Sequence, residues 1–417
     1  MSETTTAARR RVFVTGIGLV SPHGGDTDAV FDRLYAGESA IRKVRSGTAE
    51  SGVDVLLAPS EFDPEGAIPK AQLFVMDRVA QMAVLAAHRA LTAANLLVDD
   101  RGPADAGIYM GCGLGGSNAI QEAYRIYYQR QSRKLKPTSV PLIMANAPAS
   151  HISMRYGILG PSFTYSIACS SSGVAIGEAF RAVRDGYLDC AIAGGAESMV
   201  NDGTIAAWEA LSVLAKEHSD GPAASSRPFA KDRTGFVLGE GSATLVLETA
   251  ETMRARGVRP IAEIVGFGAS SDARNLTQPA VDGQVRAIRA ALADAGLGPE
   301  TIGYVNAHAT ATPAGDKIEI DALKQAFGDH ARRLAVSGTK SMHGHLVGAA
   351  GALEFAITLL ALKKQRLPPT ANLTTPDPEC DLDCIPCEGR EASDLEYALS
   401  NSFAFGGSNA VLVARRA

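Results

Sequence analysis

One cysteine occupies a position in the sequence where a thiol could act as a nucleophile. In the stretch TYSIACSSSG (164–173), Cys169 lies between an apolar, strand-like segment and a run of small residues that opens a helix. Most unpaired cysteines are small core residues. At a helix N-terminus, however, the helix dipole and the free N–H groups favour the thiolate. The stretch alone leaves both interpretations open.

Two histidines in the second half of the chain occupy comparable positions. His308 follows the apolar segment GYVNA and begins HATATP, and His345 lies in KSMHGHLVGAAG. A lone histidine is more often a structural residue, but histidines that follow strand ends are placed as active-site groups are. A thiolate with two imidazoles could carry out acyl transfer, in which the thiolate attacks and the imidazoles stabilise the developing negative charge.

The elements that must position these residues occur twice along the chain. A strand with a Gly-x-Gly turn, an Ala-rich helix followed by a strand, and a strand followed by a turn and a helix recur in the same order. The paired segments are 11–23 with 260–272, 84–96 and 106–113 with 285–297 and 302–310, and 166–186 with 335–364. Strands that alternate with helices predict parallel sheets covered by helices. We therefore expect a duplicated α/β fold whose equivalent turns meet at a pseudo-two-fold axis, with the site at the carboxyl ends of the strands.

The composition is that of an ordinary soluble globular protein. The chain has 417 residues, of which 46% are hydrophobic and 20% charged, and its net charge of −5 would not recruit nucleic acid. Its six cysteines are too few for a disulfide scaffold and indicate a reducing compartment. The apolar run after Arg11 is broken by Gly16 and Gly18, and no segment has the ~20 apolar residues of a membrane span. We expect a cytoplasmic protein that binds neither nucleic acid nor a membrane.

Several motifs resemble those of the β-ketoacyl-acyl-carrier-protein synthases. They are ACSSS with AIGEAFRAVRDGYLDCAIAGGAES, SRPFAKDRTGFVLGEGSATLVLE, NAHATATPAGDKIE, TKSMHGHLVGAAGALE and NSFAFGGSNA. The resemblance extends from Val12 to Leu412, and the sequence is similar to the type II elongating enzymes of the thiolase-like superfamily. It implies a duplicated five-layer α/β/α/β/α fold, with a half that carries the nucleophile (1–257) and a half that carries the catalytic histidines (258–417).

The resemblance also implies roles for the reactive residues. Cys169 would accept the growing acyl chain as a thioester. His308 and His345 would promote decarboxylation of the malonyl unit and stabilise the resulting enolate, and Lys340 would support His345 and the charge network. A pair of histidines distinguishes this group from the degradative thiolases, which use a second cysteine, and from the initiating synthases, which have asparagine in place of His345.

Further residues match the family's substrate site. Phe405 resembles the gate on the acyl pocket, and its backbone N–H would form an oxyanion hole with that of Cys169. Thr310, Thr312 and Glu354 are assigned to substrate binding, the threonines as hydrogen-bonding partners of the phosphopantetheine arm and Glu354 as part of the supporting shell.

The implied reaction is the decarboxylative Claisen condensation of malonyl-carrier protein with an acyl chain on Cys169, in fatty-acid or polyketide/polyene biosynthesis. The implied partner is an acyl carrier protein, which brings the phosphopantetheine, so that neither a free cofactor nor a metal is expected. The chain would form a homodimer, or a heterodimer with a chain-length-factor-like subunit, in which a segment like Val140–Ala147 helps to close the neighbour's pocket. The alternative is a non-catalytic, pocket-shaping subunit, but such subunits usually lack the nucleophile.

The sequence departs from the family pattern at a few positions. Ala309 and Ala404 stand where the family usually has glycine, and each added methyl could narrow a backbone approach or stiffen the gate. The serines that follow Cys169, together with His343, are closer to synthases of specialised polyketide or polyene pathways than to housekeeping enzymes.

Other motifs have plain interpretations. Gly111-x-Gly113-x-x-Gly116 mimics a dinucleotide fingerprint, but a tight turn that borders the acyl pocket is the better interpretation. The cysteines of the C-terminal segment are expected to be loop thiols rather than a metal cluster; they are Cys380, Cys384 and Cys387.

Two groups of charged residues keep two interpretations each. Asp316 and Glu319 are acid–base groups or carboxylates that fix turns. A basic cluster in the insertion 117–150 is a solvated face or a docking surface for an acidic carrier protein. This cluster, the basic arm cluster, consists of Arg125, Arg130, Arg133, Lys134 and Lys136.

Overall fold

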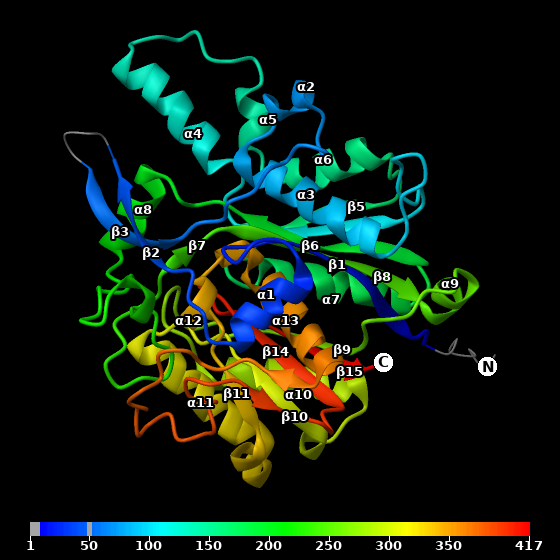
Figure 1. Cartoon of the computed structure of the whole chain (residues 1–417), viewed down its shortest axis with the longest axis vertical. Coiled ribbons are helices and arrows are strands. Elements are labelled where there is room, and N and C mark those ends of the chain that lie inside the picture. The colour runs from blue at the N-terminus through cyan, green and yellow to red at the C-terminus, as the bar shows by residue number, and fades with distance from the viewer. Residues whose placement is uncertain (1–8, 48–51) are drawn as a thin grey trace.

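The computed structural model, which describes residues 9–47 and 52–417, is built around a ten-stranded sheet (Figure 1). The strand order is β11-β10-β14-β15-β9-β1-β8-β6-β4-β5. The N-terminal half supplies β1 (Val12–Val20), β4 (Gly107–Gly111), β5 (Ser162–Tyr165), β6 (Cys190–Glu197) and β8 (Gly241–Thr249). The C-terminal half supplies β9 (Ala262–Ser271), β10 (Ile302–Asn306), β11 (Ala335–Ser337), β14 (Tyr397–Phe403) and β15 (Ser408–Arg416).

The two halves of the sheet have the same topology. β1 pairs antiparallel with β8, which pairs antiparallel with β6, and β6, β4 and β5 are parallel. In the same way, β9, β15 and β14 are antiparallel, and β14, β10 and β11 are parallel. The halves join where β1 pairs with β9 over Val12–Val14 and Ala262–Ile264. The expected duplication is confirmed.

Two details of the expected fold are wrong. The sheets are mixed rather than parallel, because β14 and β15 are joined by the short turn 404–407, and so short a connection permits only antiparallel pairing. Gly16 and Gly18 lie within β1 and form no turn there. A Cβ on Gly16 or Gly18 would stand 2.2 or 2.0 Å from a backbone oxygen of the helix that packs on this strand, so these glycines permit close contact between strand and helix.

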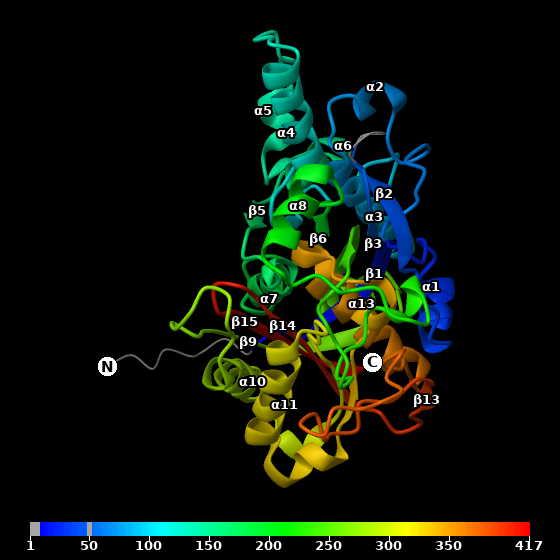
Figure 2. The same ribbon diagram turned by 90° about the vertical axis from the view of Figure 1, so that its left-hand side faces the viewer.

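Helices form three layers around the two halves of the sheet (Figure 2). The outer helices are α3 (Arg78–Ala93) and α6 (Ala147–Tyr156) on the N-terminal half, and α10 (Val281–Ala295) and α11 (Pro313–Phe327) on the C-terminal half. The central helices, α7 (Ser171–Arg184) and α13 (Ala350–Lys364), pack on each other and on both halves. Residues 350–362 of α13 are all buried, as expected for a helix enclosed on every side. The result is the expected five-layer α/β/α/β/α fold.

The remaining elements lie around this core. The insertion 117–150 forms an arm that projects from the body at the top of Figures 1 and 2, made of α4 (Ser117–Tyr124), a π-helical turn (Arg125–Gln129) and α5 (Ser139–Ile143). The other strands are β2 (Arg42–Ser46), β3 (Val53–Ala58), β7 (Leu238–Gly239), β12 (Arg366–Leu367) and β13 (Arg390–Glu391). The other α-helices are α1 (Thr27–Tyr35), α2 (Lys70–Leu73), α8 (Asp202–Ala210), α9 (Ala250–Ala255) and α12 (Lys340–His343). None of the helices in the described part of the chain is both long and apolar enough to cross a membrane.

Candidate active site

Cys169 lies on a strained turn between β5 and α7. The residue before it, Ala168, has φ of 42°, in the left-handed region that residues other than glycine rarely adopt. The Ser171 hydroxyl donates to the Ala168 carbonyl at 2.6 Å and accepts from the Ile167 N–H at 2.8 Å, which closes the turn. The turn therefore presents the thiol beside the start of α7, as the sequence predicts.

The other two serines attach this turn to the C-terminal half. The Ser170 hydroxyl lies 2.8 Å from the carbonyls of both Ser402 and Ser408, the ends of β14 and β15. The Ser172 hydroxyl accepts from the Ala352 N–H at 2.9 Å, in the first turn of α13. The run of serines thus has a structural role in fixing the nucleophile against the half that carries the histidines.

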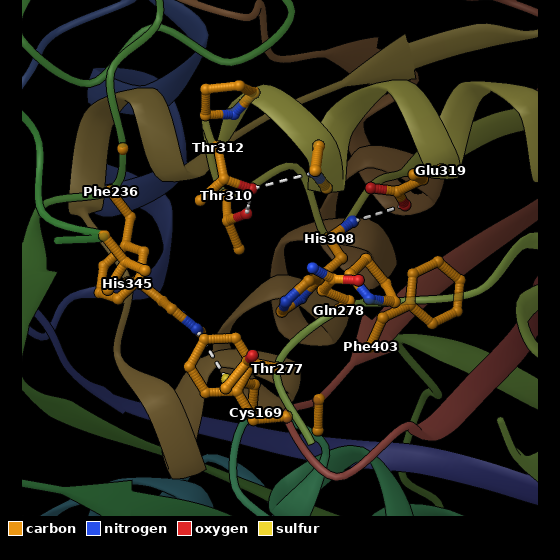
Figure 3. Close-up of a pocket in the computed structure, with 18 of the residues that line it drawn as sticks. Cys169, Phe236, Thr277, Gln278, His308, Thr310, Thr312, Glu319, His345 and Phe403 are labelled. Carbon is orange, nitrogen blue, oxygen red and sulfur yellow. Dashed lines mark hydrogen bonds between the residues drawn. The ribbon is translucent and has the colours of Figure 1, made fainter. Parts of the chain in front are cut away.

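Both histidines reach Cys169 from the C-terminal half, in a cavity of about 350 Å³ (Figure 3). His308 follows β10, and the backbone of His345 bonds to Val237 and Gly239, which flank Leu238 of β7. His345 Nε2 lies 2.9 Å from Cys169 Sγ, and the two imidazole centroids are 5.3 Å apart. One donor atom from each of the three side chains lies within 4.8 Å of the others. The structure therefore brings together the three residues that the sequence singles out.

The hydrogen bonds to the Nδ1 atoms determine which nitrogen of each imidazole carries the proton. The Val347 N–H donates to His345 Nδ1 at 3.3 Å, and Lys340 Nζ lies 3.3 Å from His308 Nδ1. Backbone N–H groups and lysine ammonium groups only donate, so both Nδ1 atoms are acceptors and both protons are on Nε2. Burial, and then the charge of Lys340, hold the pKa values of both histidines well below their usual 6.5. The site therefore contains two neutral imidazoles with Nε2–H donors.

This arrangement suits an anion better than a metal ion. A thiol and two imidazoles are a common zinc ligand set. A metal on Nε2 would move each proton to Nδ1, where it would face the Lys340 ammonium or the Val347 N–H. Both positions already hold hydrogen-bond donors, so the ligand that fits is one that accepts hydrogen bonds.

Buried charged residues hold the backbone of His308 in place. Lys340 Nζ donates to the His308 carbonyl at 2.5 Å and is paired with the Glu354 carboxylate. Glu319 accepts from the backbone N–H groups of His308 and Ala309, both at 2.8 Å. Lys340 therefore supports His308 directly, whereas the resemblance suggested support for His345.

Glu354 is not placed to bind a substrate. It is fully buried, its partner is Lys340, and it is not among the residues that line the cavity. Burial raises the pKa of Glu354 to about 7. This geometry does not favour substrate binding; it is that of a residue that positions Lys340, which agrees with the supporting-shell role.

The two carboxylates whose roles the sequence left open, Asp316 and Glu319, both accept hydrogen bonds from backbone N–H groups and so hold loops in place. Glu319 lines the cavity but directs its oxygens to the backbone of 308–309 and to Asn401. Asp316 is buried and accepts from the Phe229 N–H at 2.8 Å, and burial raises its pKa to about 7. These bonds favour the turn-fixing interpretation over acid–base chemistry.

Cys169 is a neutral thiol in this site. Burial raises its pKa to about 12, although the charge of Lys340 and the Phe405 N–H lower it. The expected preference for thiolate at the helix N-terminus is outweighed by desolvation. An incoming acyl group must therefore be accompanied by loss of the thiol proton.

Phe405 lies on the turn between β14 and β15 and lines the cavity. Its ring is 6.1 Å from that of Trp208, which contacts Phe236 at 5.5 Å, and Phe236 packs edge-on against His345 at 5.2 Å. Over residues 9–47 and 52–417, no backbone carbonyl accepts the N–H of Phe405 or of Cys169. The Phe405 N–H faces the Cys169 thiol, and neither amide is held by a backbone carbonyl, which is compatible with the expected oxyanion hole. Sequence reasoning did not single out Trp208 or Phe236.

Thr310 and Thr312 line the cavity at the start of α11 (Figure 3). Their hydroxyls are 3.0 Å apart, and Thr312 caps α11 by accepting from the Gly315 N–H. Together the two hydroxyls can offer one donor and one acceptor, which match the C=O and the N–H of an amide group.

The other motifs do not line the cavity. A Cβ on Gly111 or Gly116 would stand 2.2 or 1.9 Å from the backbone of Ser172 or Leu142, so these glycines are required by packing. Cys380 and Cys384 are buried and Cys387 is exposed, and within the described ranges the only group of potential metal ligands is the Cys169 site. The basic arm cluster lies on the arm, outside the residues that line the cavity.

Comparison with known proteins agrees with this geometry. Residues 9–253 match the family "Beta-ketoacyl synthase, N-terminal domain", and residues 261–374 match "Beta-ketoacyl synthase, C-terminal domain". Nodulation protein E of Rhizobium sp. (strain N33) is 41% identical over 407 residues, which are 98% of this chain and 99% of that protein. The 3-oxoacyl-[acyl-carrier-protein] synthase 2 of Staphylococcus aureus (strain N315) is 38% identical over 410 residues, 98% of each chain.

Solved structures show the same relationship. A beta-ketoacyl synthase from Burkholderia phymatum STM815 superposes with a TM-score of 0.90 at 36% identity, and the match covers 98% of this chain and 100% of that one. The ishigamide ketosynthase/chain length factor gives a TM-score of 0.91 at 34% identity with the same coverage. Since full-length similarity accompanies the duplicated fold and the cysteine–histidine centre, the chain belongs to the beta-ketoacyl synthase family.

Proposed function

We propose that this chain is an elongating β-ketoacyl-[acyl-carrier-protein] synthase that joins a malonyl unit to an acyl chain carried on Cys169, in fatty-acid or polyketide biosynthesis. The observation that carries the proposal is the convergence of one thiol and two Nε2–H imidazoles within 4.8 Å. A relative that is 38% identical is named as an enzyme of this activity.

In the first half-reaction, Cys169 Sγ attacks the thioester carbonyl of the acyl-carrier protein. The backbone N–H groups of Cys169 and Phe405 hold the oxyanion, and such donors contribute roughly 10²–10³ each in rate. The C–S bond to the carrier breaks, and the departing carrier thiol takes the proton that Cys169 loses.

In the second half-reaction, Thr310 and Thr312 bind the phosphopantetheine arm of the malonyl carrier. The Nε2–H groups of His308 and His345 donate to the malonyl thioester oxygen as the bond to the carboxylate breaks and CO₂ leaves. The electron pair of that bond forms an enolate that both donors stabilise. The enolate carbon then attacks the Cys169 thioester, and Cys169 leaves as a thiolate that takes up a proton from solvent.

The non-catalytic alternative is disfavoured by the intact centre. A pocket-shaping subunit would need neither the thiol nor the two imidazole donors, yet Lys340 and Val347 contact the Nδ1 atoms of the two rings, and Glu319 holds the His308 backbone. We propose that the chain is catalytic, whether its partner is identical or a chain-length-factor-like subunit. Two solved relatives are described as a ketosynthase with a chain length factor.

The proposed second partner is an acyl carrier protein, which also supplies the phosphopantetheine, so that the enzyme needs no cofactor of its own. One relative is described as a ketosynthase in complex with its acyl-carrier protein. The basic arm cluster contrasts with the net charge of −5 of the whole chain and suits an acidic carrier. In the dimer, we propose that the segment Val140–Ala147 of the arm, where Val140 and Met144 are exposed, helps to close the neighbour's pocket.

Two further assignments belong to the proposal. We place the boundary between the halves after residue 257, in the connection from α9 to β9; residues 1–8 and 48–51 of the first half lie outside the described part. We also propose that the enzyme works in the cytoplasm, which the six cysteines without disulfides support.

The test is the intact mass of the protein after incubation with acyl-carrier proteins that bear chains of varied length and unsaturation. A thioester adduct on the wild type, absent from Cys169→Ala, is expected, and the chain that transfers best identifies the substrate class. If no chain transfers even with partner subunits present, the non-catalytic alternative replaces this proposal.

A further inference from the structure

Glu197 is a buried carboxylate that the proposed reaction does not use. It is the last residue of β6 and is fully buried. Burial raises its pKa to about 7, and backbone N–H groups that donate to it oppose the shift. A carboxylate in such a place needs hydrogen bonds to offset its desolvation, so the groups that supply them indicate what it holds.

The Glu197 carboxylate joins two loops that are far apart in the sequence. Its Oε2 accepts from the Gly113 N–H at 2.7 Å and from the Gly348 N–H at 3.2 Å, and its Oε1 lies 3.4 Å from the Leu114 N–H. A Cβ on Gly113 or Gly348 would stand 2.4 or 2.5 Å from Oε2. Both positions therefore lack a side chain where the carboxylate fits between the two backbones.

One of these loops is the turn that sets the proton position on His345. Val347, next to Gly348, has φ of 45°, an unusual value for a β-branched residue. The N–H of the same residue donates to His345 Nδ1. A strained turn persists only where its surroundings hold it, and the bond from Gly348 to Glu197 is such a restraint.

The other loop is attached to the segment that leads to the nucleophile. The Gly113 carbonyl accepts from the Ser166 hydroxyl at 2.9 Å, and the Cys112 N–H donates to the Tyr165 carbonyl at 3.0 Å. Glu197 therefore links the turn behind His345 to the backbone that precedes Cys169.

We propose that Glu197 is a positioning residue for the decarboxylation step, which keeps the His345 proton on Nε2 by holding the Val347–Gly348 turn. In Glu197→Gln, the amide oxygen replaces one acceptor, but the NH₂ group faces a backbone N–H. The hydrogen bonds that join the Gly113–Leu114 loop to the Val347–Gly348 turn through residue 197, which we call the junction, are then partly lost. The rate effect rests on the proposed function, whereas the proton position does not.

Two variants test the junction from opposite sides. Glu197→Gln removes the charge and one acceptor, and Gly348→Ala keeps the carboxylate but displaces it with a methyl group. The matched control is Glu248→Gln, a buried carboxylate on the neighbouring strand, whose partners are Thr15 and Arg256 at the other end of β6. Each variant is examined in the full chain by ¹⁵N NMR of histidine nitrogens, with His345 assigned by the signals lost in His345→Asn.

The expected result is an Nε2–H signal for His345 in the wild type and in the control, and a mixture of proton positions in both junction variants. Malonyl-carrier decarboxylation should fall about tenfold to a hundredfold relative to acyl transfer to Cys169, as when residues that orient an imidazole are removed. The same proton position and the same rate ratio in Gly348→Ala as in the wild type would overturn the proposal, even if Glu197→Gln does not fold. An inactive wild type with the expected NMR difference would refute the proposed function and leave the role of Glu197 standing.

Discussion

Lys340 offers the sharpest test of how the histidines are held, because it supports both the fold and the chemistry. Its ammonium pairs with Glu354 and donates to the carbonyl and Nδ1 of His308. Lys340→Met keeps the length of the side chain and removes all three bonds. The His308 proton then has no reason to stay on Nε2, and loss of one of two enolate donors is expected to slow decarboxylation by roughly 10²–10³.

The stability effect has a different magnitude and can be separated from the rate effect. Removing one member of a buried ion pair costs about 3–5 kcal/mol, because the other charge is left without a partner. Removing both members is much less costly. The double variant Lys340→Met/Glu354→Gln is therefore expected to regain most of the free energy of unfolding that the single variant loses, while its decarboxylation stays slow.

The assays are urea unfolding for stability, and mass spectrometry of the carrier for conversion of malonyl to acetyl groups. Acyl transfer to Cys169 is followed in parallel by intact mass, and it should lose less rate than decarboxylation does, because Lys340 bonds to His308 directly but acts on Cys169 only through its charge. Wild-type decarboxylation by Lys340→Met would refute the argument that Lys340 sets the His308 proton. A double variant less stable than the single one would refute the account of the ion pair.

Three further outcomes are expected. Because His308 and His345 have pKa values well below 6.5 when folded, each lowers the free energy of unfolding as pH drops below 6.5, by up to about 1.4 kcal/mol per pH unit. The buried carboxylates Glu197, Asp316 and Glu354, whose pKa values are raised to about 7, act in the opposite direction, so the histidine effect is measured as the difference between the wild type and His345→Asn in urea titrations. A difference between the two proteins that stays the same from pH 7 to pH 5 would contradict the buried neutral state of His345. Ala309→Gly should raise the free energy of unfolding by up to about 1 kcal/mol, because Ala309 has φ of 38°, and a lower stability would show that its methyl group packs usefully. Reversing charge in the arm with Arg133→Glu and Lys134→Glu should raise the KM for acyl-carrier protein most at low salt and leave kcat unchanged, and an effect independent of salt would count against docking on the arm.

The sequence was sufficient to predict which residues meet. Duplication of a strand–turn–helix unit implies that Cys169 and His345, each just before a central helix, face each other across a pseudo-two-fold axis. The mixed sheet was missed because the alternation of strands and helices says nothing about the direction of β8 and β15. The short turn at 404–407 was the signal that could have corrected it.

Finer features of the site could not be read from residue types. The proton position on His345 depends on one backbone N–H, that of Val347, which lies in a turn where this residue has a positive φ. A valine gives no hint of such a conformation. The thiol form of Cys169 follows from burial, which depends on how Phe405 and the helices close around it, whereas the sequence displays only the favourable helix N-terminus.

The duplicated fold itself explains why a site exists at this place. α7 and α13 meet at their first turns, where a Cβ on Gly351 would stand 2.9 Å from the Gly173 nitrogen. Just before each helix is a strained residue with positive φ, Ala168 in one half and Val347 in the other. Each strained turn directs a reactive group, the thiol or an imidazole, toward the same point between the helices. Because both helices direct their positive N-terminal ends there, the position favours negative charge. Duplication thus supplies an anion site first, and the different residues on the two copies of one turn make it chemically asymmetric, with a nucleophile on one side and hydrogen-bond donors on the other.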